Sequence, residues 1–534
     1  MGLIGRFLLF GSILLVLVSC RKSTSANWDV DAVVPVVNSS LNITNFAGDS
    51  LFNTDNTGLL NISLSREVAA IKLDSILKLP DTTIVQTFTS SSPFPLNLTP
   101  GQAVNSAAPS ELEFDVSGGA KLKMINIRSG SITVKFSNSV SEPIDLIYKI
   151  PSATKNGNPF TLTETVPTGT NTLEKTYDLS GYSLNMRGIS GNAYSTIVQT
   201  YSISISSQAA QNATVNFGQG AKVEITYTEL TPDYVEGYFG QQTIKIDPDT
   251  ASFHITDNFK ASNFMLSQAS MEFNILNEFG TEFSGSIFNT ASINTEQNKV
   301  VPLVTNQLNN ININRATKVG TVIYPSVKSF SFRSDNSNIL PFISNLPDRI
   351  AYQGEIKVNP LGNISGYNDF AFYNTGIRIL ANINIPLRFT ADYFLLRSKD
   401  TEVDFSGVQQ LNNVNSGNFV ILAKNSFPFA AQLQGYMYDE NEQLLDSLFD
   451  TSVNSNIIRE GQLNALNEVT APTQSKLYVP VNKTKIDHLK RCRQIRVQSK
   501  FIMPPNPPDI KILEQYSMDV NIVAELNYRV GLTN

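Results

Sequence analysis

Two stretches decide the fold class: IRILANINIPLRF, residues 377–389, and SMDVNIVAELNYRV, residues 517–530. In the first stretch every odd position is apolar and most even positions are polar, and in the second the even positions are apolar. Successive side chains of a strand point to opposite faces, so this alternation predicts strands that bury one face and expose the other. Shorter alternations occur at 132–136, 201–205 and 223–227.

Helical periodicity is confined to short segments. The best candidates are residues 66–77 and residues 484–491, and Asn482 stands before the second as a candidate N-cap. Because alternation dominates the rest of the chain, we expect an all-β protein. Its predicted architecture is a series of tandem antiparallel β-sandwich modules with few short helices.

A weak internal repeat runs through the chain. In each of three ungapped stretches the alternating run ends in an Asn, at Asn138, Asn277 and Asn425, and an apolar residue follows two positions later. Asn suits a strand end because its amide bonds to nearby backbone and tolerates left-handed geometry. The spacings of 139 and 148 residues favour equivalent elements in three modules over a chance likeness in an Asn-rich chain. The stretches are IRSGSITVKFSNSV (127–140), LSQASMEFNILNEF (266–279) and VNSGNFVILAKNSF (414–427).

The amino-terminal end looks like a bacterial lipoprotein signal peptide. A positive charge at Arg6 precedes an apolar stretch at 7–18, which is too short to span a bilayer stably. The stretch closes with Leu17-Val18-Ser19-Cys20, which resembles the lipobox. We therefore expect cleavage before Cys20, lipid on its thiol as the only covalent group, and an extracytoplasmic chain beyond it. The alternative is an uncleaved membrane helix with an incidental cysteine.

The signals together predict six parts of the chain. The repeat spacing places three modules after a leading segment, and the polar residues after Cys20 form a short tether. The predicted parts are 1–19 (signal peptide), 20–27 (acylated cysteine and tether), 28–112 (leading β segment), 113–247, 248–400 and 401–534 (β-sandwich modules).

Composition excludes some classes of function. The formal charge is −6, or −7 once Arg6 is removed, and this mildly acidic balance disfavours nucleic-acid binding. Charged residues make up 16% of the chain, below the usual quarter. With Cys20 acylated, Cys492 is left without a disulfide partner. We interpret Cys492 as a buried small residue at a helix end, and the alternative interpretation is a reactive thiol.

Catalytic and metal-binding signals are scarce. Only His254 and His488 could serve a Ser–His–acid or Cys–His mechanism, and no G-x-S-x-G elbow is present. A zinc site would need more His or Cys than the chain has. Residues 53–58 and 439–442 carry oxygen ligands without the spacing of a calcium loop, so turns fit them better. We expect a non-enzymatic protein with no metal and no cofactor other than the lipid.

Several short phrases resemble the large β-rich outer-membrane and surface lipoproteins of Bacteroidota. The phrases are Trp28-Asp29-Val30-Asp31, Val34-Pro35-Val36-Val37-Asn38, Leu41-Asn42-Ile43, Leu79-Pro80-Asp81-Thr82-Thr83, Asp178-Leu179-Ser180-Gly181-Tyr182 and Asn345-Leu346-Pro347-Asp348. The resemblance implies an outer-membrane location, at the cell surface rather than on the periplasmic face. Members often carry acidic residues just after the cysteine, and Arg21-Lys22 departs from that pattern.

The same resemblance implies covalent modification. Five Asp-Ser/Thr-apolar tripeptides look like the O-glycosylation signal of that phylum, somewhat more than the roughly two that average residue usage gives. The predicted acceptors are Ser50, Ser75, Thr82, Thr250 and Ser447.

The sequence leaves three functions open. The resemblance implies a non-enzymatic interaction subunit that docks on an outer-membrane β-barrel protein or other lipoproteins and serves barrel assembly, secretion or uptake. A fimbrial or adhesin subunit is the second hypothesis, in which the strand at 518–530 complements a neighbouring sandwich. The third is a glycan-binding or glycan-cleaving lipoprotein, although Trp28, the only tryptophan, offers little stacking surface.

Overall fold

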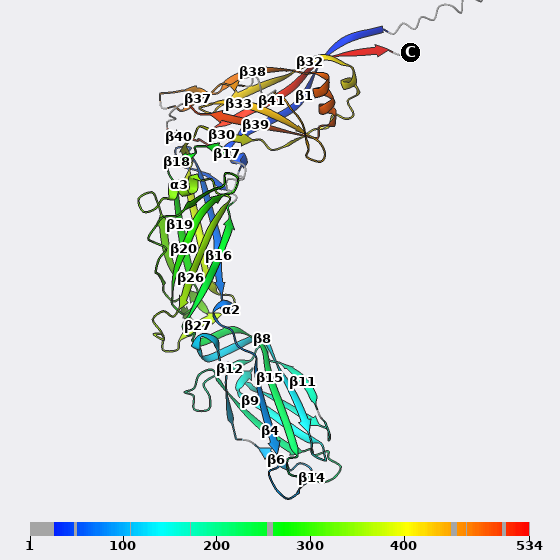
Figure 1. The fold of residues 1–534 in the computed structure, drawn as a ribbon, viewed down its shortest axis with the longest axis vertical. Helices are drawn as coiled ribbons and strands as arrows, with labels where there is room; N and C mark the ends of the chain where they lie inside the picture. The colour runs from blue at the N-terminus through cyan, green and yellow to red at the C-terminus, as the bar shows by residue number, and fades with distance from the viewer. Residues whose placement is uncertain are drawn as a thin grey trace, which may run out of the picture. The chain divides into compact units, whose positions relative to one another are not determined.

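The protein is all-β, as the alternation predicts (Figure 1). The computed structural model describes residues 26–46, 51–106, 108–170, 172–253, 260–449, 457–465, 467–504 and 509–532. Strand accounts for 61% of the structure and helix for 6%. The α-helices in these ranges are α2 (Leu73–Ile76), α3 (Ile339–Ser344) and α4 (Lys483–Arg491).

Residue contacts divide the chain into two compact units, and each is discontinuous in sequence. Unit 1 comprises residues 1–62, 253–268 and 385–534, and unit 2 comprises residues 63–252 and 269–384. Residues 253–268 and 385–400, which the sequence prediction gave to the middle module, thus group with the carboxyl-terminal unit. The cause is strand pairing, because β17 (Lys260–Ser262) pairs with β30 (Tyr393–Arg397), which pairs with β39 (Gln494–Ile502).

Unit 2 contains the first and second repeats. The first repeat is one 11-stranded sheet built around β8 (Lys121–Asn138) and β15 (Gly220–Tyr238), whose pairing is irregular at several points. The second repeat has one sheet with β19 (Ser270–Asn277) beside β28 (Gly376–Pro386) and another sheet around β26. The other strands of unit 2 include β6 (Ala103–Ser106), β9 (Ile144–Lys155), β10 (Asn158–Val166), β11 (Leu173–Asp178), β13 (Thr196–Ile205), β16 (Gln242–Ser252), β20 (Phe283–Asn294), β25 (Ser326–Phe332), β26 (Arg349–Val358) and β27 (Asp369–Phe372).

Unit 1 contains the third repeat. Its four-stranded sheet has the order β1-β41-β32-β38, and a second sheet runs β17-β30-β39-β33-β34. The alternation quoted first is reproduced at every position from Ile377 to Phe389, where each odd residue is buried. The principal strands are β1 (Ala26–Asn42), β32 (Val414–Asn425), β33 (Ala430–Tyr438), β34 (Leu444–Ser447), β38 (Thr473–Pro480) and β41 (Ser517–Leu532).

The leading segment supplies a strand that pairs with the closing strand of each repeat. Strand β1 pairs with β41 in antiparallel register from Ala26↔Leu532 to Asn42↔Ser517, with one bulge after Pro35. Strand β3 (Leu60–Lys72) lies beside β28, and β4 (Thr82–Thr89) pairs with β15. Along the sequence, the leading segment thus contributes strands to the third, second and first repeats in that order. The repeats themselves follow in the order first, second and third. Each closing strand (β15, β28 or β41) therefore lies between a leading strand and a repeat strand.

The three repeated Asn residues make the same hydrogen bonds. Each is buried, its Oδ1 accepts the backbone N–H two residues later, and its Nδ2 donates to the carbonyl four residues later and to one from a more distant loop. The Oδ1 bonds are Val140 N to Asn138 at 2.8 Å, Phe279 N to Asn277 at 2.9 Å and Phe427 N to Asn425 at 2.9 Å. The Nδ2 acceptors are the carbonyls of Glu142 and Val166, of Thr281 and Asn314, and of Phe429 and Arg459. The predicted equivalence of these strand-and-turn elements is confirmed, and we call each one an Asn corner. None of the three Asn residues has a positive φ, so the expected left-handed geometry is absent.

The residue after each Asn fixes the start of the closing strand. Its N–H donates to the carbonyl of Gly220, Gly376 or Ser517, at 2.9, 3.0 and 2.9 Å. Its side chain accepts the N–H of the same residue, through Ser139 Oγ, Glu278 Oε2 and Ser426 Oγ. Each corner therefore joins the end of one strand to the beginning of another that lies about 80–100 residues later.

Each repeat has a small residue eight positions before its Asn (Gly130, Ala269 or Gly417), and close packing requires the glycine at two of these positions. A Cβ at Gly130 would lie 2.7 Å from the Leu230 side chain, and at Gly417 it would lie 2.5 Å from the Glu525 carbonyl. Both contacts are made with the closing strand, so a larger side chain would push that strand away.

One helix prediction is confirmed and the other is wrong over most of its length. Helix α4 begins after Asn482, whose Oδ1 accepts the Lys485 N–H at 2.8 Å. Residues 66–72, by contrast, belong to strand β3, and only α2 is helical. Their moderate helix propensity yields to pairing with β28.

A buried ionic network lies where β15 meets the second repeat. Asp369 is fully buried, and its Oδ1 lies 2.9 Å from Arg315 Nη2. Its Oδ2 accepts the Phe239 N–H at 3.0 Å and Asn359 Nδ2 at 2.8 Å. Burial raises the pKa of nearby Glu282. The network ties the end of the first repeat to the second through one carboxylate.

We predict that Asn425→Asp lowers the urea midpoint of unfolding. The carboxylate keeps the bond to the Phe427 N–H but has no hydrogen for the two carbonyls, so the free energy of unfolding should fall by about 1–3 kcal/mol. The control is Asn384→Asp at an exposed residue that only accepts a bond, from Ser63 Oγ. Circular dichroism monitors the urea unfolding of both variants. Equal midpoints would contradict the structural role of the Asn425 corner.

We also predict that Asp369→Ala destabilises the protein by about 3–5 kcal/mol, because it removes the charge partner closest to Arg315 and the acceptor of two buried hydrogen bonds, from the Phe239 N–H and from Asn359 Nδ2. Glu113→Ala removes an exposed ion pair with Lys121 and should change stability by less than about 1 kcal/mol. Urea titrations of both variants measure the difference, and a loss at Asp369 as small as that at Glu113 would refute this account.

Candidate functional site

The predicted modification sites lie in different surroundings. Cys20 and Ser50 fall outside the described residues, as does His254. Ser75 in α2 and Thr250 in β16 are exposed. Thr82 and Ser447 are half-buried, and their hydroxyls donate to the carbonyls of Pro80 and Phe449, respectively. The structure brings no two of the described acceptors together, so they form no common site.

The residues around His488 form a structural clamp on α4. His488 Nδ1 lies 3.1 Å from Asp446 Oδ2, and the buried Lys485 donates to the Ser447 carbonyl at 2.6 Å. These contacts hold α4 against β34. Cys492 is fully buried at the end of the helix, and burial raises the pKa of its thiol. A raised pKa disfavours the thiolate, so Cys492 fits the structural interpretation.

The two oxygen-rich segments are turns. Asp55 Oδ1 accepts the N–H of Thr57 at 2.8 Å and of Leu59 at 3.1 Å. Asp439 Oδ1 accepts the N–H of Asn441 and of Gln443, both at 2.9 Å. These bonds occupy the carboxylates with their own backbone. Within the ranges that the structure describes, no group of three or more His, Cys, Asp and Glu residues is placed to hold a metal ion.

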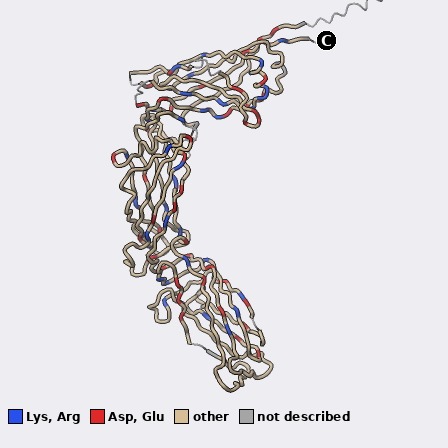
Figure 2. Tube along the Cα trace, in the orientation of Figure 1, with Lys and Arg blue, Asp and Glu red and all other residues tan. Residues whose placement is uncertain are grey.

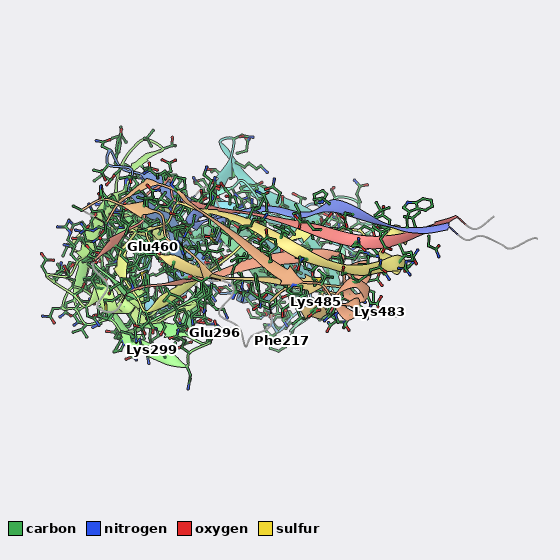
Figure 3. All side chains as sticks on the ribbon, turned by 90° about the horizontal axis from the view of Figure 1, so that it is seen from above. Phe217, Glu296, Lys299, Glu460, Lys483 and Lys485 are labelled. Atoms are coloured by element: carbon green, nitrogen blue, oxygen red, sulfur yellow. The ribbon has the colours of Figure 1, made fainter. Side chains whose placement is uncertain are left out.

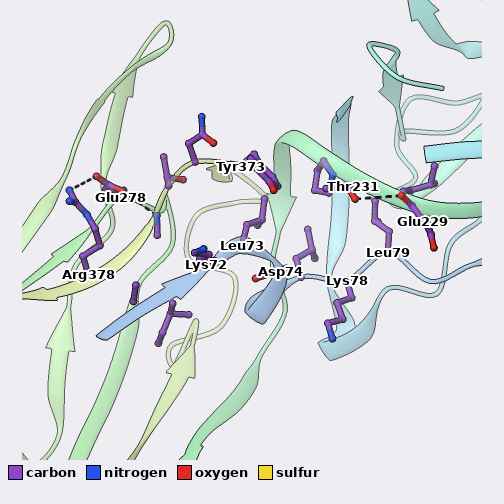
Figure 4. Close-up of a pocket in the computed structure, with 18 of the residues that line it drawn as sticks. Lys72, Leu73, Asp74, Lys78, Leu79, Glu229, Thr231, Glu278, Tyr373 and Arg378 are labelled. Atoms are coloured by element: carbon purple, nitrogen blue, oxygen red, sulfur yellow. Dashed lines mark hydrogen bonds and ion pairs between the residues drawn. The ribbon is translucent and has the colours of Figure 1, made fainter. Parts of the chain in front are cut away.

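A cavity of about 740 Å³ lies within unit 2 (Figure 4). Charged side chains of both signs line it, together with the leucines around α2. Glu278 belongs to the second Asn corner, because it accepts the Gly376 N–H at 3.2 Å and Arg378 Nη2 at 3.0 Å. Its carboxylate is thus committed to holding the closing strand.

The most distinctive surface is the end of the first repeat at which its Asn corner lies. Residues 90–102, 167–170 and 206–219 meet there, and we call them the uncharged pole. These 31 residues contain no Asp, Glu, Lys or Arg, whereas the 16% charge of the whole chain would give about five. The adjoining turn has one charged residue, Glu142, which is buried. The loops beside β14 (Ala213–Val215) are correspondingly tan in Figure 2.

Backbone hydrogen bonds join the loops of the pole. The Ser90 N–H donates to the Gln219 carbonyl, and the Gly218 N–H donates to the Ser90 carbonyl, both at 2.9 Å. Strand β5 (Leu96–Leu98) pairs with β14, and the Gly101 N–H donates to the Ile205 carbonyl at 3.0 Å. The third loop is attached through Thr168 Oγ1, which donates to the Val140 carbonyl at 2.7 Å.

Two phenylalanines project from this surface. Phe94 is 75% exposed and Phe217 is 71% exposed, and Leu96 beside them is 41% exposed. Phe217 is labelled in Figure 3. Large apolar side chains gathered on a charge-free surface are typical of the core of a binding interface. The absence of charge over these segments is the sequence signal that could have revealed this surface.

The backbone at both phenylalanines is held by hydrogen bonds within its loop. Ser92 Oγ accepts the Phe94 N–H at 3.2 Å and donates to the Phe94 carbonyl at 2.8 Å, and prolines at 93 and 95 fix the flanking backbone. Phe217 lies in a turn in which the Gln219 N–H donates to the Asn216 carbonyl at 3.0 Å. Gly218 supplies the positive φ of 78° that the turn needs. The pole therefore offers two aromatic side chains on preorganised loops.

Comparisons with known proteins leave the family open. No protein-family model matches the chain, and no curated protein matches it. The crystal structure of a "putative secreted protein" from Parabacteroides distasonis is similar over 94% of this chain and 99% of that one, with 10% identity and a TM-score of 0.26. The structure of infectious bursal disease virus, Gx strain, is similar over 86% of this chain and 81% of that one, with 9% identity and a TM-score of 0.11. Likenesses this weak support no conclusion about function.

The helices that the structure describes include none with the length and apolar character needed to cross a membrane.

We predict that Cys492 resists thiol labelling in the native state. In a Cys20→Ala background it is the only cysteine. Local opening that costs about 3 kcal/mol would slow labelling by roughly 100-fold relative to the urea-unfolded chain. Ser75→Cys places a thiol at an exposed position and should label without urea. Fast native labelling with a single-cysteine stoichiometry would show that the buried placement is wrong.

Proposed function

We propose that the protein is a lipid-anchored outer-membrane lipoprotein and a non-enzymatic interaction subunit of an outer-membrane complex. The proposed complex serves barrel assembly, secretion or uptake, and its partner is an outer-membrane β-barrel protein or another lipoprotein. The lipid on Cys20 holds the chain at the membrane, since multiple acyl chains attach a protein durably.

The uncharged pole carries this proposal. Its 31 residues contain no charged side chain, and it exposes two aromatic side chains rather than catalytic groups. The polypeptide itself connects the proposed lipid anchor to the uncharged pole. Residues 26–89 lead from the proposed tether to the first loop of the pole, and each repeat pairs with a strand of this segment.

The alternatives receive less support. Donor-strand complementation requires a closing strand that is free to leave its own sheet, but β41 is paired on both sides, with β1 and with β32. Glycan binding requires polar side chains that are free to bond sugar hydroxyls. At the pole, Gln102 and Gln219 instead accept the backbone N–H groups of Thr99 and Asn216.

We predict that Cys20→Ala releases the protein from the membrane fraction and abolishes its labelling by fatty acid. Cys492→Ala is the matched control, because it removes the other cysteine and leaves the tether intact. Mild detergent extraction of the unmodified protein should then recover a partner in fixed ratio. A Cys20→Ala variant that stays with the envelope would contradict the anchor, and recovery of the protein alone would contradict the role as a subunit.

A further inference from the structure

We propose that the uncharged pole binds an uncharged, apolar pocket on a protein partner, into which Phe94 and Phe217 insert. The inference rests on the proposed function and names the surface by which the subunit is held. It starts from the absence of charge. A charged partner surface would lose hydration at the pole and gain no ion pair, so the complementary surface is itself uncharged.

Size and composition match a protein interface. A standard interface uses roughly 20–30 residues on each side, and 28 of the pole's 31 residues are exposed or half-buried, all but Ser206, Ala213 and Val215. The core of an interface is depleted in charge and enriched in aromatic residues. Loops at the end of a sandwich that combine aromatic anchors with Ser, Asn and Gly also resemble binding loops of known paratopes in composition.

A lipid surface fits the pole less well. Sixteen of its 31 residues are Ser, Thr, Asn or Gln. Transfer of hydroxyl and amide groups into hydrocarbon is unfavourable unless they are hydrogen-bonded. The pole also has no Lys or Arg with which to attract anionic head groups.

A glycan fits less well because three polar side chains of the pole are engaged within their own loops. Ser92, Gln102 and Gln219 bond backbone groups of their own loops. These bonds rigidify the loops, which lowers the conformational entropy lost when the two phenylalanines are buried in a pocket. The rings then provide most of the affinity, because burial of one such side chain changes binding by about 10- to 100-fold.

A photo-crosslinking residue at Ser91, three residues before Phe94, tests the inference in intact cells that carry the full chain. Ser91 is exposed, and the control position Val319 is an exposed apolar residue outside the pole. We expect one protein adduct from Ser91 and none of that mass from Val319. Because the contact has no ion pairs, the adduct yield should be unchanged in 1 M salt, roughly the concentration at which surface charges are fully screened.

Two variants test whether the adduct depends on the two phenylalanines or on any exposed apolar side chain. The double variant Phe94→Ser/Phe217→Ser should reduce the adduct at least about tenfold. Leu361→Ser, which removes a residue that is 73% exposed elsewhere, should leave the adduct unchanged. All of these side chains are exposed, so equal urea midpoints check that the fold is intact. Mass spectrometry then identifies the partner, and titration with the purified partner should show the same loss of affinity.

The outcomes distinguish this inference from the proposed function. If the partner is recovered in fixed ratio but the double variant retains it, the subunit role stands and the pole inference fails. If no partner is recovered with the unmodified chain, the proposed function itself fails. Phe-dependent binding to phosphatidylcholine vesicles, or an adduct that consists of glycan, would overturn the assignment of a protein partner.

Discussion

The fold depends on how each closing strand is held on both edges. Strands β15, β28 and β41 each pair with a repeat strand on one side and with a strand of the leading segment on the other. In the third repeat this pairing joins Ala26 to Leu532. Such contacts close very long loops, and loop closure costs entropy that grows only slowly with length. High contact order therefore slows folding more than it reduces stability.

The Asn corner is the element that three repeats with little sequence in common share. A buried amide presents an acceptor and two hydrogens, and each corner uses them for backbone groups that no strand ladder satisfies. Asp lacks the two hydrogens and Leu lacks every polar atom, so neither can replace Asn. The neighbouring residue is less constrained, because Ser139, Glu278 and Ser426 all provide the one oxygen that the closing strand needs.

Local chemistry was readable from the sequence and long-range pairing was not. Alternation from Ile377 to Phe389 identified a strand with one buried face, and Asn482 marked the start of α4. No local sequence pattern indicated which strands the leading segment pairs with, since β1 pairs with a strand about 500 residues away. Phe94 is an exception to the general rule that large apolar residues are buried. Its neighbours Pro93 and Pro95 and the charge-free segment around it carry the information that alternation alone cannot give.

The path of the leading segment has a mechanical consequence for the proposed lipid-anchored protein. Residues 26–89 connect the proposed tether to the pole, and hydrogen bonds in an antiparallel pair lie perpendicular to the strands. The segment can lengthen through its strands only if they slide past their partners, which loads many bonds at once instead of one after another. Strand β1 keeps its partner from Ala26 to Asn42, and β4 keeps its partner from Thr82 to Thr89, where the pole begins. Strands of the leading segment thus connect the proposed tether to the pole while they pair with the closing strands of the three repeats.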